Sequence, residues 1–277
     1  PLDEWTDGVV LDRDYRSIRI VVSELPRDLK RGIWRIDRGA NRVAHDRMRT
    51  AIEQMCSVEE EFTVLRDALM LGLFDPDRSI SNPEKFAKNP ELIALNASQR
   101  MAVLKTAHQR ITLIQGPPGT GKTTTAVASV RHLLATGEGP ILVTAESNVG
   151  VDNLLEGLIE NGVPALRLGQ PVKVRAALRE ATLDARMIQH PLYTDLEEER
   201  KALDRLSRKA QGLKGKEKGM AFKDRGILLK HVKGLERRIT EEIIERAPVI
   251  CATCIGSGHD RLSGIKFPVV VLDEATQ

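Results

Sequence analysis

Residues 116–123 read Gly116-Pro117-Pro118-Gly119-Thr120-Gly121-Lys122-Thr123 and match the phosphate-loop pattern G-x-x-x-x-G-K-[ST] at every fixed position. The apolar run 111–114 predicts a strand that feeds this loop, and a helical pattern follows from Thr124 to Leu134. Glycines let backbone N–H groups close around phosphates, and the N-terminus of the helix adds its positive end. The segment therefore predicts a nucleoside-triphosphate site.

Two side chains of this loop carry specific predicted roles. Lys122 is expected to reach the β- and γ-phosphates, and Thr123 is expected to hold Mg²⁺ through its hydroxyl. The other expected nucleotide contacts are Gly116, Pro117, Pro118, Gly119, Thr120, Gly121 and Thr124. The alternative is a glycine-rich turn that matches by chance, and a second motif at the end of the chain weighs against it.

That second motif follows the apolar run Phe267–Leu272, which predicts a strand buried on both faces. The run delivers Asp273 and Glu274 at its carboxyl end, where a parallel sheet places its ligands. Asp273 is expected to complete the Mg²⁺ sphere, directly or through water. Glu274 is expected to orient and deprotonate the attacking water. The alternative is a solvated acidic turn.

Length and composition limit the class of protein. The chain has 277 residues, enough for one large or two ordinary domains. A formal charge of +3 is too mild to establish a nucleic-acid partner, and 3% aromatic residues offer few platforms for stacking bases. No apolar run reaches the roughly 18 residues of a membrane span. The chain opens on Pro1 and stops just after a catalytic strand, so both ends are expected to be cuts through a longer protein.

The three cysteines are Cys56, Cys251 and Cys254, a content that fits a reducing compartment, the cytoplasm or the nucleus. The spacing Cys251-x-x-Cys254 also occurs in metal and redox sites. Here it falls in a predicted strand, where residues three apart point to opposite faces. No second cysteine pair or histidine cluster completes a zinc set, so the sequence disfavours a metal site.

Alternating strands and helices after the phosphate loop predict an α/β fold around a parallel sheet. Residues 57–174 and 247–277 make up this predicted domain. Residues 1–38 carry three strand-like runs and predict part of a small β-barrel, and residues 39–56 have helical periodicity. Residues 175–246 predict an inserted antiparallel helical hairpin, because two apolar stripes flank a basic, glycine-broken turn. Its basic residues either meet a nucleic-acid backbone or form a solvated face.

Polar side chains at predicted helix starts are further candidates. Gln99 lies some twenty residues before the loop, and a carboxamide offers the donor and acceptor pair that adenine needs, although a surface glutamine explains the spacing equally. Asn96 is placed to cap the helix that carries Gln99. Ser147 and Asn148 open a helix whose N-terminus suits a nucleic-acid phosphate. Ordinary N-capping is the alternative for both.

The motifs, taken in chain order from about residue 95 to the end, resemble those of superfamily 1 helicases of the up-frameshift-like group. The resemblance rests on Leu95-Asn96-x-Ser98-Gln99, Leu113 through Thr123, Thr144-Ala145-x-Ser147-Asn148-x-x-x-Asp152, Arg167-Leu168-Gly169, Cys251-x-Thr253-Cys254-x-Gly256-x-Gly258 and Leu272-Asp273-Glu274-Ala275-Thr276-Gln277.

This resemblance implies a RecA-like motor domain that binds ATP and Mg²⁺. It implies that Gln99 contacts adenine and that Gln277 senses the γ-phosphate. Ser147, Asn148 and Thr253 would lie along the path of a single strand. Residues 1–38 would be the tail of a β-barrel insertion, 39–56 a stalk helix, and 175–246 a second insertion.

The resemblance also implies ATP-driven 5′ to 3′ movement on single-stranded RNA or DNA, with a second RecA-like domain of the same parent chain. Because the sequence stops at the acidic motif, this stretch alone is expected to bind ATP weakly and to unwind nothing. Two alternatives stay open: a P-loop ATPase that acts as a clamp loader or assembly switch without nucleic acid, and a non-enzymatic nucleic-acid-binding module. Gln99 and the ending Glu274–Gln277 weigh against the first, and intact Lys122 weighs against the second.

Overall fold

The computed structural model describes residues 8–13, 17–22, 42–56, 60–72, 92, 94–170, 173–212 and 215–276. The chain divides into two compact units, Pro1–Ser57 and Val58–Gln277. Within the described ranges, no helix is long and apolar enough to cross a bilayer.

The first unit contains a strand pair and a helix. Strands β1 (Gly8–Arg13) and β2 (Ile18–Val22) are antiparallel, with an irregularity between Val10 and Asp12. Helix α1 (Arg42–Cys56) coincides with the predicted helical segment. The apolar residues on one stripe of α1, Val43, Met48, Ile52 and Met55, are exposed. The third strand-like run, residues 32–36, lies outside the described residues.

The second unit is built on a four-stranded parallel sheet in the order β4-β5-β3-β6. The strands are β3 (Ile141–Ala145), β4 (Ala165–Arg167), β5 (Val249–Thr253) and β6 (Val269–Asp273). The predicted α/β class with a parallel sheet is therefore confirmed. The pairing register sets Ala145 level with both Thr253 and Asp273, so three strands end together at one edge.

Alternate strand residues enter two different cores, because successive side chains of a strand point to opposite faces. On one face, Ile141 and Val143 of β3 pack with helices α6 (Lys122–Ala135) and α7 (Asn148–Glu160). On the other face, Leu142 of β3 packs with residues of α8 (Leu183–Ile188), α9 (Tyr193–Gly212) and α10 (Gly215–Glu245). The remaining elements are α2 (Glu60–Leu71), α5 (Ala97–Thr106), α11 (Cys254–Ser257) and the short 3₁₀ helices η2 (Ala176–Ala181) and η3 (Asp260–Leu262).

Two predicted strands need correction. Residues 111–114 form no strand, and Leu113 is 79% exposed, because no strand in the described part of the chain pairs with this run to complete its hydrogen bonds. The apolar run before Asp273 does form β6, but that strand is covered on one face only. Val269 and Val271 pack against the core that α6 and α7 help to form, whereas Val270 and Leu272 are exposed, because the core on the other face includes no described residue of β6.

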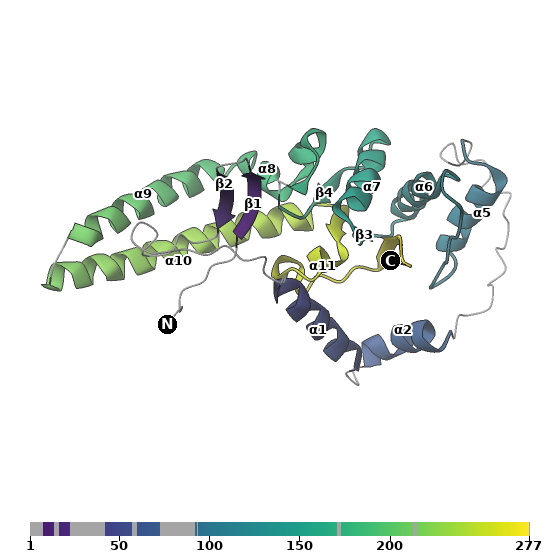
Figure 1. Cartoon of the computed structure of the whole chain (residues 1–277), viewed down its shortest axis with the longest axis horizontal. Coiled ribbons are helices and arrows are strands. Elements are labelled where there is room, and N and C mark those ends of the chain that lie inside the picture. The colour runs from purple at the N-terminus through teal and green to yellow at the C-terminus, as the bar shows by residue number, and fades with distance from the viewer. Residues whose placement is uncertain are drawn as a thin grey trace. The chain divides into compact units, whose positions relative to one another are not determined.

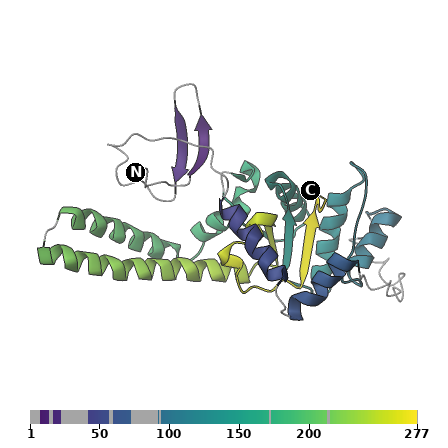
Figure 2. The same ribbon diagram turned by 60° about the horizontal axis from the view of Figure 1, so that its bottom comes forward.

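Helices α9 and α10 run side by side, as both views show (Figures 1 and 2). They are antiparallel, because Arg200 pairs with Glu236 near one end and Arg225 donates to Ser207 nearer the other. Their connection at 213–214 lies outside the described residues. The helical pair begins at Tyr193, later than the predicted boundary at residue 175. The intervening residues 176–188 instead pack into the two cores of the sheet.

Candidate nucleotide and nucleic-acid sites

The phosphate loop contains three glycines whose space or backbone conformation disfavours a larger residue. Gly121 precedes α6 with a φ of 82°, and a Cβ on it would lie 2.6 Å from Nε2 of Gln99. A Cβ on Gly116 would lie 2.6 Å from Oγ1 of Thr120. Gly119 also has a positive φ, 77°, which disfavours any side chain. The loop therefore forms a cradle lined by main chain, as phosphate binding requires.

Lys122 lies within the curve of this loop. Its Nζ donates to the carbonyl oxygens of Gly116 at 2.8 Å and of Pro117 at 3.0 Å. Thr120 donates from Oγ1 to the same Pro117 carbonyl at 2.7 Å. An ammonium held among main-chain groups at the N-terminus of a 14-residue helix suits an anionic ligand. The residues present thus fit a phosphate group.

Thr123 and Asp273 are the expected Mg²⁺ ligands. Thr123 is half-buried in the first turn of α6, and Asp273 is half-buried at the end of β6. Helix α6 packs against β6, which makes the two elements neighbours. A hydroxyl and a carboxylate are oxygen ligands of the kind that Mg²⁺ prefers, so this pair of residues fits the ion. Thr124, the next residue, is exposed.

Glu274 is exposed and has a positive φ of 55°, the only such non-glycine residue among those described. Its main-chain N–H donates to Oδ1 of Asp273 at 2.9 Å. Its carboxylate approaches the first turn of α7, because Oε2 lies 3.6 Å from the point that a Cβ on Gly150 would occupy. A left-handed conformation costs an ordinary residue about 1–2 kcal/mol, which is typical of functional positions.

Gln99 is joined to the phosphate loop. Its Nε2 donates to the carbonyl of Thr120 at 3.1 Å, and its Oε1 accepts from the main-chain N–H of Asn96 at 3.0 Å. Asn96 in turn accepts from Gln99 N at 2.9 Å, so the two residues form a capping box. The cap on Asn96 was predicted, and the bond to the loop was not. One amide hydrogen and one lone pair of Gln99 stay available for a base edge.

Ser147 and Thr253 cap adjacent helices. Ser147 accepts from Gly150 N at 3.0 Å at the start of α7, and Thr253 accepts from Gly256 N at 3.0 Å at the start of α11. The alternative of ordinary N-capping is thus realised. A hydroxyl still carries a donor after accepting one bond, so capping leaves both side chains able to donate to a phosphate.

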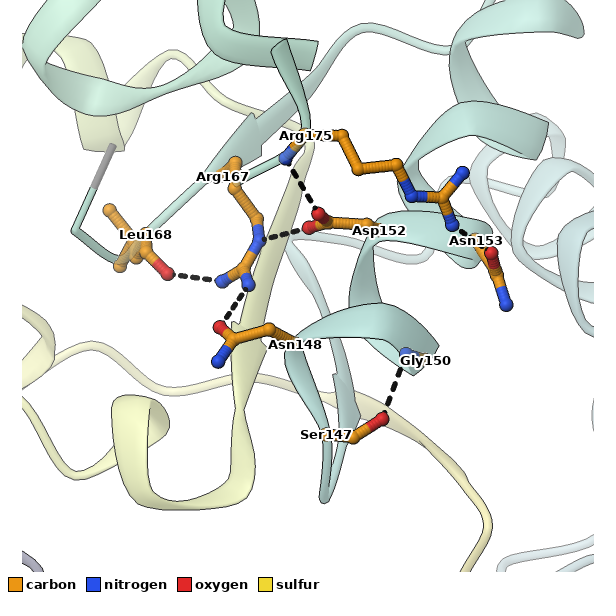
Figure 3. Close-up of polar contacts among 8 residues, drawn as sticks. All are labelled: Ser147, Asn148, Gly150, Asp152, Asn153, Arg167, Leu168 and Arg175. Carbon is orange, nitrogen blue, oxygen red and sulfur yellow. Dashed lines mark hydrogen bonds and ion pairs between the residues drawn. The ribbon is translucent and has the colours of Figure 1, made fainter. Parts of the chain in front are cut away.

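Asn148 belongs to a buried polar network that the sequence motifs did not explain (Figure 3). Arg167 is fully buried and pairs with buried Asp152 at 3.1 Å. Its Nη2 donates to Oδ1 of Asn148 at 2.8 Å, and its Nη1 donates to the carbonyl of Leu168. Oδ2 of Asp152 accepts from Arg175 N at 3.0 Å. An arginine between the apolar residues of a short strand was the available sequence signal.

The two remaining candidates are the cysteine pair and Gln277. Cys251 is buried within β5, and burial raises the pKa of its thiol to about 12. Cys254 lies in α11 and accepts a weak bond from Thr144 at 3.5 Å. The described part of the chain contains no cluster of three metal-ligating His, Cys, Asp or Glu side chains. Gln277 lies outside the described residues.

The chain matches the model of one protein family, described as an AAA domain, over residues 94–277. It is 35% identical over 260 residues to a regulator of nonsense transcripts 1 homolog of Arabidopsis thaliana. The aligned residues make up 91% of this chain and 19% of that protein. It is 33% identical over 242 residues to the ATP-dependent helicase NAM7 of Saccharomyces cerevisiae, covering 84% of this chain and 23% of that protein.

A third relative is the DNA polymerase alpha-associated DNA helicase A of Schizosaccharomyces pombe. It is 29% identical over 283 residues, which cover 99% of this chain and 42% of that protein. The chain therefore spans less than half the length of these curated relatives.

Proposed function

Because the chain belongs to the AAA domain family and to the up-frameshift-like superfamily 1 helicases, we propose that it is the ATP-binding part of a motor that moves along single-stranded RNA or DNA. The observation that carries the proposal is the common edge where β3, β5 and β6 end level with one another. Nucleotide candidates and nucleic-acid candidates leave this edge on adjacent strands.

The nucleotide half of the proposal assigns roles to four side chains. Lys122 binds the β- and γ-phosphates, Thr123 and Asp273 hold Mg²⁺, and Gln99 binds the adenine edge. The cradle of Gly116 and Gly121, with Lys122 inside its curve, supports this assignment. Bound ATP supplies the phosphoanhydride whose hydrolysis drives movement.

Glu274 is proposed as the general base that orients the attacking water and takes its proton. Its place directly after Asp273 supports this role, since the metal ligand and the base must face the same phosphate. Its carboxylate also lies at the first turn of α7, the turn that Ser147 caps. The base is therefore adjacent to the proposed nucleic-acid contact.

The nucleic-acid half of the proposal rests on Ser147, Asn148 and Thr253. All three lie at helix N-termini directly beyond β3 and β5, where donors meet phosphate oxygens. We further propose 5′ to 3′ movement, a nucleotide cleft completed by a second RecA-like domain, and γ-phosphate sensing by Gln277. The strands β1 and β2 would belong to a β-barrel insertion with α1 as its stalk, and α9 and α10 to a second insertion.

The test is ATP hydrolysis by the full-length protein with and without single-stranded RNA or DNA, with the Lys122→Ala variant as the blank. Strong stimulation by either polymer supports the motor and identifies its track. If neither single-stranded RNA nor single-stranded DNA changes the rate of hydrolysis, an assembly-switch ATPase is favoured instead.

A further inference from the structure

The buried ion pair of Arg167 and Asp152 links the sheet to the start of α7. Arg167 is the last residue of β4 and points to the face of the sheet that α7 covers. Asp152 lies one turn into that helix and pairs with Arg167. Both side chains are essentially inaccessible, at 0% and 2% exposure. Burying two charges is costly, and removing either partner alone would leave the other charge buried without compensation. Such a pair fixes its surroundings firmly.

The third partner of the pair is Asn148, and its orientation follows from chemistry. A guanidinium only donates hydrogen bonds, so Asn148 must turn its carbonyl oxygen Oδ1 toward Arg167. The amide nitrogen Nδ2 then lies on the opposite side, away from Arg167 (Figure 3). Among the described residues Nδ2 has no hydrogen-bond partner. Asn148 thus presents two donor hydrogens at the N-terminus of α7.

We propose that Arg167, held by Asp152, is a positioning residue that sets the Asn148 amide with its donor side outward, ready for a phosphate oxygen of a single nucleic-acid strand. The inference rests on the proposed contact between Asn148 and nucleic acid. With Arg167 absent, the amide can turn over and present its oxygen, which repels a phosphate. Arg167 would then support grip on the strand without touching it.

Gly169 gives independent support for a guanidinium in this place. A Cβ on Gly169 would lie 3.1 Å from Nη1 and 3.7 Å from Cζ of Arg167, closer than ordinary packing allows for the first atom. Two requirements therefore explain the glycine of the motif Arg167-Leu168-Gly169: room for the guanidinium, and a φ of 154°, which other residues rarely adopt. Asp152 belongs to the motif that also contains Asn148, and its ion pair with Arg167 explains why an acidic residue stands there.

The thiol of Cys251 in β5 does not compete with Asp152 for the guanidinium of Arg167. Cys251 is paired in register with Arg167, and a thiolate there would draw the guanidinium away from Asp152. Burial raises the pKa of the Cys251 thiol to about 12, so the thiol is neutral at physiological pH. Arg167 therefore keeps Asp152 as its counter-ion and Asn148 as its neutral acceptor.

The experiment measures the dissociation constant of the full-length protein for labelled oligouridylate and oligothymidylate by fluorescence anisotropy, at one fixed salt concentration. Asn148→Ala removes the donor and defines the size of the effect, about tenfold for a bond to a charged group. The double variant Arg167→Met with Asp152→Leu removes the pair while leaving no uncompensated charge. Arg237→Met on the exposed surface of α10 is the matched control for loss of one arginine charge.

The expected result is that the double variant binds both oligonucleotides more weakly than the wild type, by up to the loss seen in Asn148→Ala. In an Asn148→Ala background the double change should cause no further loss, because it acts only through the orientation of that amide. ATP affinity is the accompanying measurement, since general damage to the fold would lower it together with oligonucleotide affinity. A folded double variant that binds oligonucleotide like the wild type would overturn the proposal.

Two further outcomes are separated by the design. If Asn148→Ala itself binds normally while RNA or DNA still stimulates ATP hydrolysis, the positioning role is overturned and the motor function stands. If nucleic acid neither binds nor stimulates the wild type, the proposed function fails first. Should the double variant not fold, Gly169→Ala replaces it, because this change displaces the guanidinium while keeping both charges. Unchanged oligonucleotide affinity in a folded Gly169→Ala variant would also overturn the proposal.

Discussion

The carboxamide of Gln99 donates from Nε2 to the carbonyl of Thr120 over 3.1 Å, across 21 positions of the chain. The same amide accepts from the N–H of Asn96, three residues before it. One side chain therefore caps α5 and braces the phosphate loop at the same time. A change at this residue is expected to alter nucleotide binding and local stability together.

We expect Gln99→Ala to lower ATP affinity about tenfold, because it removes the brace of the loop and the proposed base contact, each worth about 0.5–1.5 kcal/mol. The ratio of the ATP affinity to the GTP affinity should also fall. Displacement of a fluorescent nucleotide by unlabelled ATP and by unlabelled GTP measures the two affinities and their ratio. Gln170→Ala, at an exposed position, is the control. Unchanged affinity and preference would separate Gln99 from the nucleotide.

Lys122→Ala is expected to abolish productive ATP binding. The ammonium lies inside the loop curve, and a charged hydrogen bond contributes about 1.5–3 kcal/mol, which corresponds to a loss of at least tenfold. Isothermal titration calorimetry measures the affinity. The exposed Lys223→Ala on α10 should bind like the wild type. Equal affinities of the two variants would place the nucleotide elsewhere.

Glu274→Gln is expected to keep ATP binding while lowering the hydrolysis rate by about 10²–10⁴-fold, the usual contribution of a general base. Single-turnover hydrolysis with excess protein separates the chemical step from binding. Glu146→Gln is the matched control, since Glu146 is an exposed carboxylate directly after β3. Hydrolysis at the normal rate in Glu274→Gln would remove this residue from the chemistry.

The ion pair of Arg167 and Asp152 predicts an asymmetry in stability. Asp152→Ala leaves a buried guanidinium unpaired and should lower the free energy of unfolding by about 3–5 kcal/mol. The double variant Arg167→Met with Asp152→Leu should lose far less. Arg237→Ala breaks an exposed pair with Glu241, which water and salt screen, and should leave the free energy of unfolding nearly unchanged. Urea denaturation measures all three, and equal losses for the single and double changes would contradict the buried pair.

Cys251 predicts a loss of stability at alkaline pH. Burial raises the pKa of its thiol to about 12, above an unfolded value near 8.5. The contribution to stability is therefore complete below about pH 8.5 and declines as the pH rises toward 12. Between pH 8 and pH 10, the wild type should lose about 1–2 kcal/mol more unfolding free energy than Cys251→Ala does, since the other alkaline groups are common to both.

Iodoacetamide labelling at pH 8 tests the same burial independently. Exposed Cys56 should be alkylated in the folded protein, whereas Cys251 should react only after unfolding. Mass spectrometry of the peptides distinguishes the three thiols. Rapid alkylation of Cys251 in the folded state would show that the β5 core opens to solvent.

Much of the fold was predictable because its signals are local. The pattern from Gly116 to Thr123 requires only neighbouring residues, and the apolar runs of β3 and β5 are visible as contiguous stretches. The cap on Asn96 was predictable for the same reason. The predictions that went wrong depend on which elements lie next to a segment in space, and the local sequence does not reveal this. Residues 111–114 have strand composition without a partner strand, and β6 has apolar residues on a face that no described element covers.

By itself, the sequence determined the class of fold, the nucleotide motifs and their order, since each depends on residue types at fixed short spacing. Tertiary structure alone decided which polar side chains meet. Gln99 and Thr120 lie 21 positions apart, Asn148 and Arg167 lie 19 apart, and Asp152 and Arg167 lie 15 apart. The Gln99 contact exists because α5 packs against α6, and the two Arg167 contacts exist because α7 packs on β4 and β5. A sequence motif does not show which side chains are buried. Burial holds Arg167 in one position, and this position makes it a partner of Asn148.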